Sequence, residues 1–332
     1  MLSTTQNKNS TFQSSRNSTI LSSLNIVDRF KTSRAKAKYP NTFQNLSKPN
    51  NINKDTQIVF VFDIDDTLVK TMQLIFNCFK DATKNLTKQR QSELVGKNLQ
   101  EFTDKFLDKD FAKGKIDIMT TKIEEQLKDK EKLASSPRAD YDSKYKDVDI
   151  ISNAISTLEL LKKIKQETGL NIKTVLFSNN YMDNLESSPN CQILFKHADA
   201  VFASDREWYK DGDITKSRPI RKGKPETPAL IYGLDKNNIS VESGKSIFFG
   251  IGDRKTDITV FDNLRKEKQS HIGSCFYLDT HSRAREEAKH DSIAVDVGNN
   301  HKDVQEWIKL ATSMIKQHID NQSSKINSQK VA

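Results

Sequence analysis

The sequence predicts an α/β protein in which a doubly wound parallel sheet carries one long all-helical insertion. Continuous apolar runs recur along the chain, as expected of strands that are buried on both faces of a parallel sheet. Helical patterns lie between several of these runs, which indicates right-handed crossover connections. Residues 70–148 contain only helical patterns, so the insertion falls between the first two predicted strands.

Each predicted strand is identified by its own apolar run. The runs lie at 57–62, 172–177, 199–203, 246–251 and 274–278, with a weaker sixth run at 293–297. Residues 150–165 and 304–318 carry apolar side chains at helical spacing, so each of these segments predicts an amphipathic helix that packs against the sheet.

The domain limits follow from the same patterns. We expect an α/β core formed by residues 55–69 and 149–320, with the helical insertion at 70–148. Residues 135–147 are predicted to be the linker that returns from the insertion to the core. Residues 1–54 are rich in Ser, Asn, Thr and Gln and are predicted to be disordered, and residues 321–332 are predicted to be a flexible tail.

The N-terminal tail carries most of the positive charge. Residues 1–54 contain nine basic residues and one acid, which leaves +8 of the formal net charge of +9 in the tail. Because the rest of the chain is nearly neutral, we expect no nucleic-acid partner. A short apolar stripe at 20–27 predicts an amphipathic helix, and residues 18–38 could make weak contact with an anionic membrane. The alternative is a tail that only keeps the chain in solution.

Composition favours a soluble protein. No apolar run approaches the roughly 18 residues that a membrane-spanning helix needs. The three cysteines lie far apart in the sequence, which favours a reducing compartment, and we expect the cytoplasm. An acid-poor, Ser-rich start also resembles an organelle transit peptide, so an organelle-targeted protein or a secreted effector is the alternative.

Three acids follow the first predicted strand. Asp63, Asp65 and Asp66 come directly after the apolar run, and Thr67 follows them. Open α/β sheets bind ligands at the carboxyl ends of their strands. Buried acids at such a place need a cation or hydrogen-bond donors, so these residues predict a functional site. The alternative is a plain turn in which Asp66 and Thr67 cap the next helix.

Polar residues also follow the second and fourth predicted strands. Ser178 and Asn179 supply a hydroxyl and an amide, which together with backbone N–H groups could bind a phosphate. A glycine turn follows the fourth strand and carries Asp253 and Asp257. Taken singly, each of these patterns is common in ordinary turns.

One lysine stands out between these two segments. Lys224 lies just before a predicted helix start, and Pro225 is near the first helical position. Lys222 is the main alternative to Lys224 as the functional lysine, and Lys216 is a weaker alternative. These lysines lie in one predicted basic loop with Arg218 and Arg221. The rest of this loop is predicted to be solvated surface, or to attract an anionic substrate.

In their order and spacing, these residues resemble the haloacid dehalogenase (HAD) superfamily. The matching motifs are, in chain order, DxDxT at 63–67, the serine motif at Ser178, the lysine motif at Lys224 and GDxxxD at 252–257. The intervals are 115 residues from Asp63 to Ser178, 46 to Lys224 and 29 to Asp253. The resemblance covers residues 57 to about 310.

The resemblance implies a Mg²⁺-dependent phosphohydrolase that works through an aspartyl-phosphate. In it, Asp63 would be the nucleophile and Asp65 the general acid and base. The residues expected to bind the substrate phosphate are Thr67, Ser178, Asn179 and Lys224, and those expected to bind the metal are Asp63, Asp65 through its backbone carbonyl, Asp253 and Asp257. Dehalogenating relatives lack an acid at the position of Asp65, which favours phosphate-ester chemistry.

The insertion resembles a C1-type helical cap, which would close over the site and exclude water. The expected substrate is a small phosphorylated metabolite or a phosphoprotein of the phosphotyrosine type. Two alternatives stay open: a HAD phosphomutase or phosphotransferase, and a non-catalytic HAD-fold binding protein recruited by its basic tail. The oligomeric state is open as well.

Overall fold

The computed structural model describes residues 52–96, 115–128, 130–204, 206–211, 214–279 and 295–331. The predictions for the N-terminal tail, including the apolar stripe at 20–27, lie outside these residues. Within the described ranges, no helix is both long and apolar enough to cross a bilayer.

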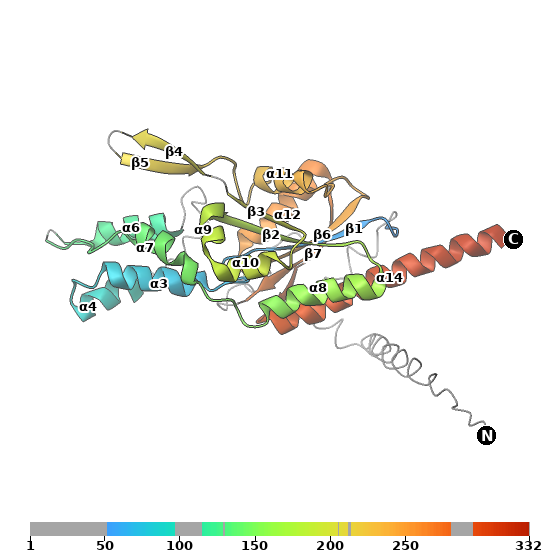
Figure 1. The fold of residues 1–332 in the computed structure, drawn as a ribbon, viewed down its shortest axis with the longest axis horizontal. Helices are drawn as coiled ribbons and strands as arrows, with labels where there is room; N and C mark the ends of the chain where they lie inside the picture. The colour runs from blue at the N-terminus through green and yellow to red at the C-terminus, as the bar shows by residue number, and fades with distance from the viewer. Residues whose placement is uncertain are drawn as a thin grey trace, which may run out of the picture.

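The centre of the fold is a six-stranded parallel sheet (Figure 1). Its strands are β1 (Gln57–Phe62), β2 (Ile172–Tyr181), β3 (Ala200–Ser204), β6 (Ser246–Gly252), β7 (His271–Leu278) and β8 (Val295–Gly298). All six predicted strands are confirmed, although β2 continues past its apolar run and β7 begins before its own. The doubly wound parallel α/β architecture is confirmed as well.

The strand order places β1 in the middle of the sheet. From one edge the order is β3-β2-β1-β6-β7-β8, with every neighbouring pair parallel. The chain therefore winds from β1 towards one edge and then returns to the other side of β1. This reversal between β1 and β6 is the switch point at which open α/β sheets form a crevice at the carboxyl ends of their strands.

Alternate residues of β1 belong to two separate cores, one on each face of the sheet. Phe60 points into the core that α8 (Ala154–Thr168) and α14 (His301–Val331) cover. Val61 points into the core that α11 (Pro228–Lys236) and α12 (Lys255–Lys268) cover. Figure 1 shows these two helix layers on opposite sides of the sheet.

Trp307 anchors α14 to the sheet. Its ring is fully buried, and its centroid lies 6.1 Å from Phe60, 5.7 Å from Phe249 and 5.3 Å from Phe276. Truncation of a buried aromatic side chain of this kind costs about 3–5 kcal/mol of stability. The start of α14 is therefore fixed firmly against three neighbouring strands.

The described part of the insertion between β1 and β2 is helical. It contains α3 (Thr71–Ala82), α4 (Lys88–Gln91), a π-helical turn (Ser92–Gly96), α6 (Lys115–Gln126), α7 (Pro137–Lys144) and a 3₁₀ turn (Tyr145–Asp147). Figure 1 shows these helices together beyond one end of the sheet. The return linker predicted at 135–147 is wrong, because α7 lies there. The Ser136 side chain caps α7, and Pro137 occupies its first turn, as helix starts favour.

The prediction that Lys216 and Arg218 lie in a basic loop before Lys224 is wrong, because these two residues belong to a strand. Strands β4 (Arg206–Asp211) and β5 (Ile214–Pro219) form a two-stranded antiparallel hairpin that projects from the body in Figure 1. Lys216 and Arg218 belong to β5. The sequence between the two strands is the pair Gly212-Asp213, a hairpin turn signal that this prediction overlooked.

Two predicted domain ends also differ from the structure. Residues 321–331, predicted to be a flexible tail, continue α14 as a helix up to Val331. They contain no glycine or proline that would end the helix. At the other end, Ile52 is buried in the core, so the folded body begins slightly before residue 55.

Candidate functional site

A tight turn at the end of β1 presents the acidic motif. Asp63 N–H still bonds to the Ile251 carbonyl of β6 at 2.8 Å, after which the chain leaves the sheet. Asp66 adopts a positive φ of 63°, which Asp tolerates better than most residues. Its carboxylate accepts a hydrogen bond from Met72 N at 2.7 Å at the start of α3. Asp66 thus accepts a hydrogen bond from the first turn of α3, as the plainer interpretation predicted, although Lys70 occupies the N-cap position.

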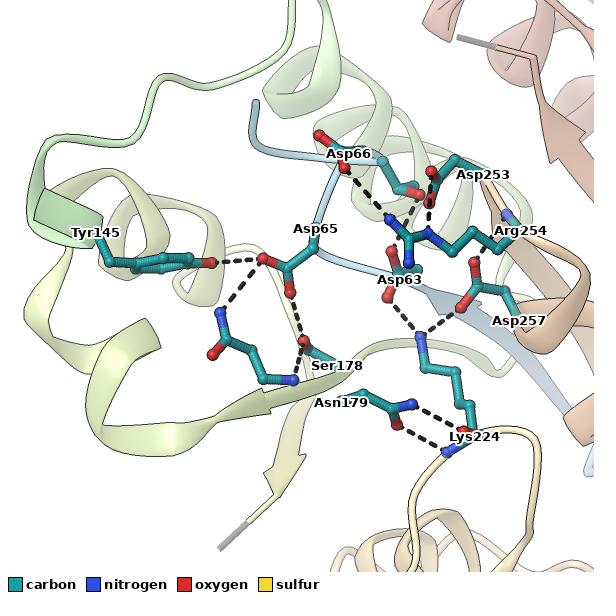
Figure 2. Close-up of polar contacts among 12 residues, drawn as sticks. Asp63, Asp65, Asp66, Tyr145, Ser178, Asn179, Lys224, Asp253, Arg254 and Asp257 are labelled. Atoms are coloured by element: carbon teal, nitrogen blue, oxygen red, sulfur yellow. Dashed lines mark hydrogen bonds and ion pairs between the residues drawn. The ribbon is translucent and has the colours of Figure 1, made fainter. Parts of the chain in front are cut away.

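Asp63 lies at the centre of a buried charged cluster (Figure 2). Its carboxylate accepts hydrogen bonds from Lys224 Nζ at 2.5 Å and from Thr67 Oγ1 at 3.3 Å. One oxygen each of Asp63, Asp253 and Asp257 lie within 4.8 Å of one another. Asp63 and Asp253 directly follow β1 and β6, the two strands that flank the switch point, and Asp257 lies in the first turn of α12.

Burial and charge shift the titration of this cluster. Burial, together with the neighbouring Asp257 carboxylate, raises the pKa of Asp63 to about 8, although Lys224 acts to lower it. Burial acts to lower the pKa of Lys224, but Asp257 and Asp63 outweigh it and hold that pKa above its usual range. Lys224 therefore stays a cation, and Asp63 needs further positive charge beside it to ionise at neutral pH.

The backbone of Lys224 is fixed by neighbouring side chains. The Asn179 amide donates to the Lys224 carbonyl at 2.8 Å and accepts from the Lys224 N–H at 2.7 Å. Gly223 allows this approach, because a Cβ there would lie 2.2 Å from Asn179 Oδ1. On the far side, Asn263 of α12 donates to the Pro225 carbonyl at 2.9 Å. Lys222, the rival lysine, is 76% exposed and points to Glu226.

Asp253 and Asp257 flank the start of α12. The Asp257 carboxylate accepts from Arg254 N at 3.0 Å, which caps the helix, and from Lys224 Nζ at 2.8 Å. Gly252 is required here, because a Cβ would lie 2.3 Å from Asp257 Cβ. Three carboxylates so close together match the oxygen ligands that Mg²⁺ prefers, so the residues present fit that ion.

Asp65 faces a different environment from Asp63. Its carboxylate accepts hydrogen bonds from Ser178 Oγ at 2.6 Å, Tyr145 Oη at 3.1 Å and Asn180 Nδ2 at 3.3 Å. Burial first, and the Asp65 charge second, raise the pKa of Tyr145 well above its usual value, so its hydroxyl stays a donor. Tyr145 thus joins the inserted helices to the acidic motif (Figure 2).

Tyr145 was missed by sequence reasoning because it lies in the segment predicted to be a linker. Its ring packs edge-to-face on Tyr141, with 5.4 Å between centroids, and both rings are buried. Tyr141 in turn accepts a hydrogen bond from Asn180 Nδ2 at 3.2 Å. Two aromatic residues four positions apart after a Ser-Pro helix start were the signal that could have revealed this contact.

His301, at the start of α14, supports the acidic turn from behind. Its Nε2 lies 2.7 Å from the Thr67 carbonyl, and its Nδ1 lies 3.2 Å from Thr157 Oγ1. The ring is fully buried, and burial lowers its pKa. A neutral ring that donates from Nε2 fits these contacts. No local sequence signal marked His301.

The structure brings most of the predicted site residues together at the carboxyl ends of the central strands. The side chains that lie close together there are those of Asp63, Asp65, Thr67, Ser178, Lys224, Asp253 and Asp257. Asn179 contacts the Lys224 backbone instead of pointing at the carboxylates. The chemical roles predicted for these residues stay predictions.

Comparison with known proteins gives only distant similarities. No family model matches the chain, and no curated protein matches it. A HAD family hydrolase from Deinococcus radiodurans R1, solved with bound phosphate and sodium, is 14% identical with a TM-score of 0.47, covering 79% of this chain and 98% of that chain.

Two further similar structures belong to proteins named for different activities. A putative phosphoglycolate phosphatase from Lactobacillus plantarum is 14% identical with a TM-score of 0.44, covering 77% of this chain and 99% of that chain. A dehalogenase with an intermediate complex is 12% identical with a TM-score of 0.44, covering 79% and 98% respectively. The chain is thus similar to solved HAD-superfamily structures, and its chemistry has to be inferred from its own side chains.

Proposed function

We propose that this chain is a Mg²⁺-dependent phosphohydrolase that cleaves phosphate monoesters through an aspartyl-phosphate on Asp63. One observation carries the proposal. Asp63 lies in a cluster with two further carboxylates and a buried lysine, while Asp65, two residues later, accepts hydrogen bonds from neutral donors. A nucleophile and a proton-transfer group thus lie side by side at the switch point of the sheet.

The chemistry follows from these two carboxylates. An oxygen of Asp63 attacks phosphorus, and the bond between phosphorus and the ester oxygen breaks, with its electron pair left on that oxygen. Asp65 gives that oxygen a proton. Asp65 then takes a proton from a water molecule whose oxygen attacks the same phosphorus. The bond to Asp63 breaks, its carboxylate is restored and inorganic phosphate leaves.

Ser178 and Lys224 would hold the phosphoryl oxygens during both steps. The Lys224 ammonium already contacts Asp63 at 2.5 Å, so it lies beside the atom that would bond to phosphorus. The Ser178 hydroxyl lies 2.6 Å from Asp65 and would turn towards the phosphoryl group when substrate binds. Fixed donors of this kind stabilise charge in phosphoryl transfer.

The acidic cluster supports a role for a divalent cation. Asp63, Asp253 and the backbone carbonyl of Asp65 would hold it, with Asp257 acting through water or by orienting Asp253. When bound, Mg²⁺ would neutralise the repulsion between the nucleophile and the anionic substrate.

The inserted helices support a site for a protruding phosphate group. Tyr145 reaches the acidic motif from these helices, as a cap that covers the site would require. The substrate class is a small phosphorylated metabolite or a phosphoprotein of the phosphotyrosine type. A panel of phosphorylated metabolites and phosphopeptides separates the two.

Hydrolysis of para-nitrophenyl phosphate by the full chain, with and without Mg²⁺, tests the proposal. We expect turnover with Mg²⁺, none in EDTA, and a loss in Asp253→Ala that extra Mg²⁺ restores at most partly. Asp262→Asn is a matched control, because Asp262 is an α12 acid that pairs with Arg265 and Lys266. It should keep activity within about twofold.

Three results would redirect the proposal. Full activity in EDTA would rule out the metal. Phosphoryl transfer between two substrates without release of phosphate would favour the phosphomutase alternative. No turnover across the whole panel would favour a non-catalytic binding protein.

A further inference from the structure

Two cations lie among the carboxylates of the site, and the first is held tightly. Lys224 Nζ lies 2.5 Å from Asp63 and 2.8 Å from Asp257, and its side chain is only 3% exposed. Distances of this kind are typical of short, charge-assisted hydrogen bonds. Lys224 is therefore a fixed part of the cluster.

The second cation, Arg254, is held loosely. Its Nε lies 3.5 Å from Asp253 and its Nη2 lies 3.6 Å from Asp66, which are longer distances than good hydrogen bonds. Nη2 is buried and donates no hydrogen bond within the described part of the chain, which is costly for a guanidinium. The side chain is nevertheless 19% exposed, so it reaches the surface. Charge, rather than hydrogen-bond geometry, holds Arg254 in place.

Arg254 contacts the carboxylate that a metal would need. Asp253 belongs to the cluster of three acids, whereas Asp66 does not. A divalent cation beside Asp253 would repel a guanidinium a few ångströms away, since two positive charges at that separation interact strongly when partly buried. Arg254 and the metal therefore compete for the same partner.

We propose that Arg254 is a displaceable counter-ion that neutralises Asp253 until a divalent cation takes its place. The inference rests on the proposed function, because it takes Asp253 as a metal ligand. On displacement Arg254 keeps Asp66 as its partner and turns towards solvent. Arg254 thereby lowers the affinity of the site for divalent cations and sets the concentration at which the site fills.

Binding of Mn²⁺ to the full chain, measured by calorimetry without substrate, tests this inference. Arg254→Gln should bind Mn²⁺ on the order of tenfold more tightly than wild type, because the competing charge is gone. Arg254→Lys keeps the charge on a shorter stem and should fall between the two. If Arg254→Gln folds poorly, the lysine variant alone decides, and an affinity no higher than that of wild type overturns the inference.

The matched control is Arg265→Gln. Arg265 also lies on α12 and pairs with an aspartate, Asp262, at 2.5 Å, but outside the cluster. Its replacement removes the same charge and should leave the affinity for Mn²⁺ within about twofold. An equal gain in Arg254→Gln and Arg265→Gln would overturn the inference, because net charge alone would then explain it.

Asp253→Ala separates this inference from the proposed function. If Asp253→Ala loses Mn²⁺ binding and Arg254→Gln shows no gain, only the role of Arg254 is wrong. If Asp253→Ala binds Mn²⁺ as well as wild type does, the metal assignment fails, and the role of Arg254 fails with it.

Discussion

Asp63 and Asp65 are two residues apart, yet they face opposite environments. Asp63 lies among carboxylates and a buried lysine, and its pKa is raised to about 8 chiefly by burial. Asp65 accepts hydrogen bonds from the neutral groups of Ser178, Tyr145 and Asn180. The charged side suits a nucleophile that bonds to phosphorus once cations balance its charge. The neutral side suits a group that must both give and take a proton.

Replacement of the charged member should have the largest effect. Asp63→Asn is close in shape but cannot form an acyl-phosphate, so turnover should fall by at least about 10³-fold. Steady-state assays with several substrates measure the loss, and circular dichroism checks that the fold is intact. Activity within tenfold of wild type would contradict the nucleophile assignment.

Asp65→Asn should be smaller in effect and should depend on the substrate. Removal of a general acid typically costs about 10²–10⁴-fold with a poor leaving group. With para-nitrophenyl phosphate, whose leaving group needs little protonation, the loss in kcat/KM, which reports the steps up to formation of the aspartyl-phosphate, should be clearly smaller. Parallel assays with an alkyl phosphate measure this difference, and equal losses on both substrates would contradict the acid role. Asp63→Asn should show no such dependence.

Tyr145→Phe tests whether the neutral side is held in place from the insertion. The change removes one hydrogen bond to Asp65, so kcat should fall by about tenfold or less, with KM changed little. Tyr232→Phe is the matched control, because Tyr232 lies partly exposed on α11. Equal kinetics of the two variants would show that the contact between Tyr145 and Asp65 has no effect on turnover.

The smallest effect concerns the stability of the metal-free protein. The folded chain keeps the Asp63 proton up to about pH 8, whereas the unfolded chain releases it near 3.8. Between these values the unfolded chain binds fewer protons, so the contribution of Asp63 to stability is lost as pH rises. Asn does not titrate, so the melting temperature of Asp63→Asn should rise relative to that of wild type by about 7–15 °C from pH 5 to pH 8 in EDTA, because three pH units of linkage amount to roughly 4 kcal/mol. A constant difference across this range would argue against the raised pKa.

Most of the sheet, and most of the residues on the charged side of the site, could be predicted from the sequence. Buried parallel strands are continuous apolar runs, so their positions can be predicted from the chain alone. The acids, Ser178 and Lys224 follow such strands or precede a helix, where their types and spacing carry information. The neutral side could not be predicted in the same way. Tyr145 lies 80 positions from Asp65, and no local pattern indicates that the two side chains meet.

Two other segments, the hairpin β4–β5 and the end of α14, were predicted wrongly for reasons that lie in their own sequences. The hairpin β4–β5 is short and charged, so its residues resemble a basic loop, and only the Gly212-Asp213 pair in the sequence indicated otherwise. The long end of α14 is polar, so it resembled a tail, yet a helix can continue without apolar residues when nothing in its sequence stops it.

The contact between His301 and the Thr67 carbonyl joins residues 234 positions apart. The support of the acidic turn therefore depends on a helix that is synthesised after all six strands of the described sheet. A fragment that ends before α14 would lose His301, whose ring contacts the Thr67 carbonyl, as well as the helix that covers one face of the sheet. A fragment that ends after Ile319 would keep it, together with Trp307 and the other side chains of that helix that the structure describes as buried. The candidate site can therefore be complete only after the start of α14 has been synthesised and has packed against the sheet.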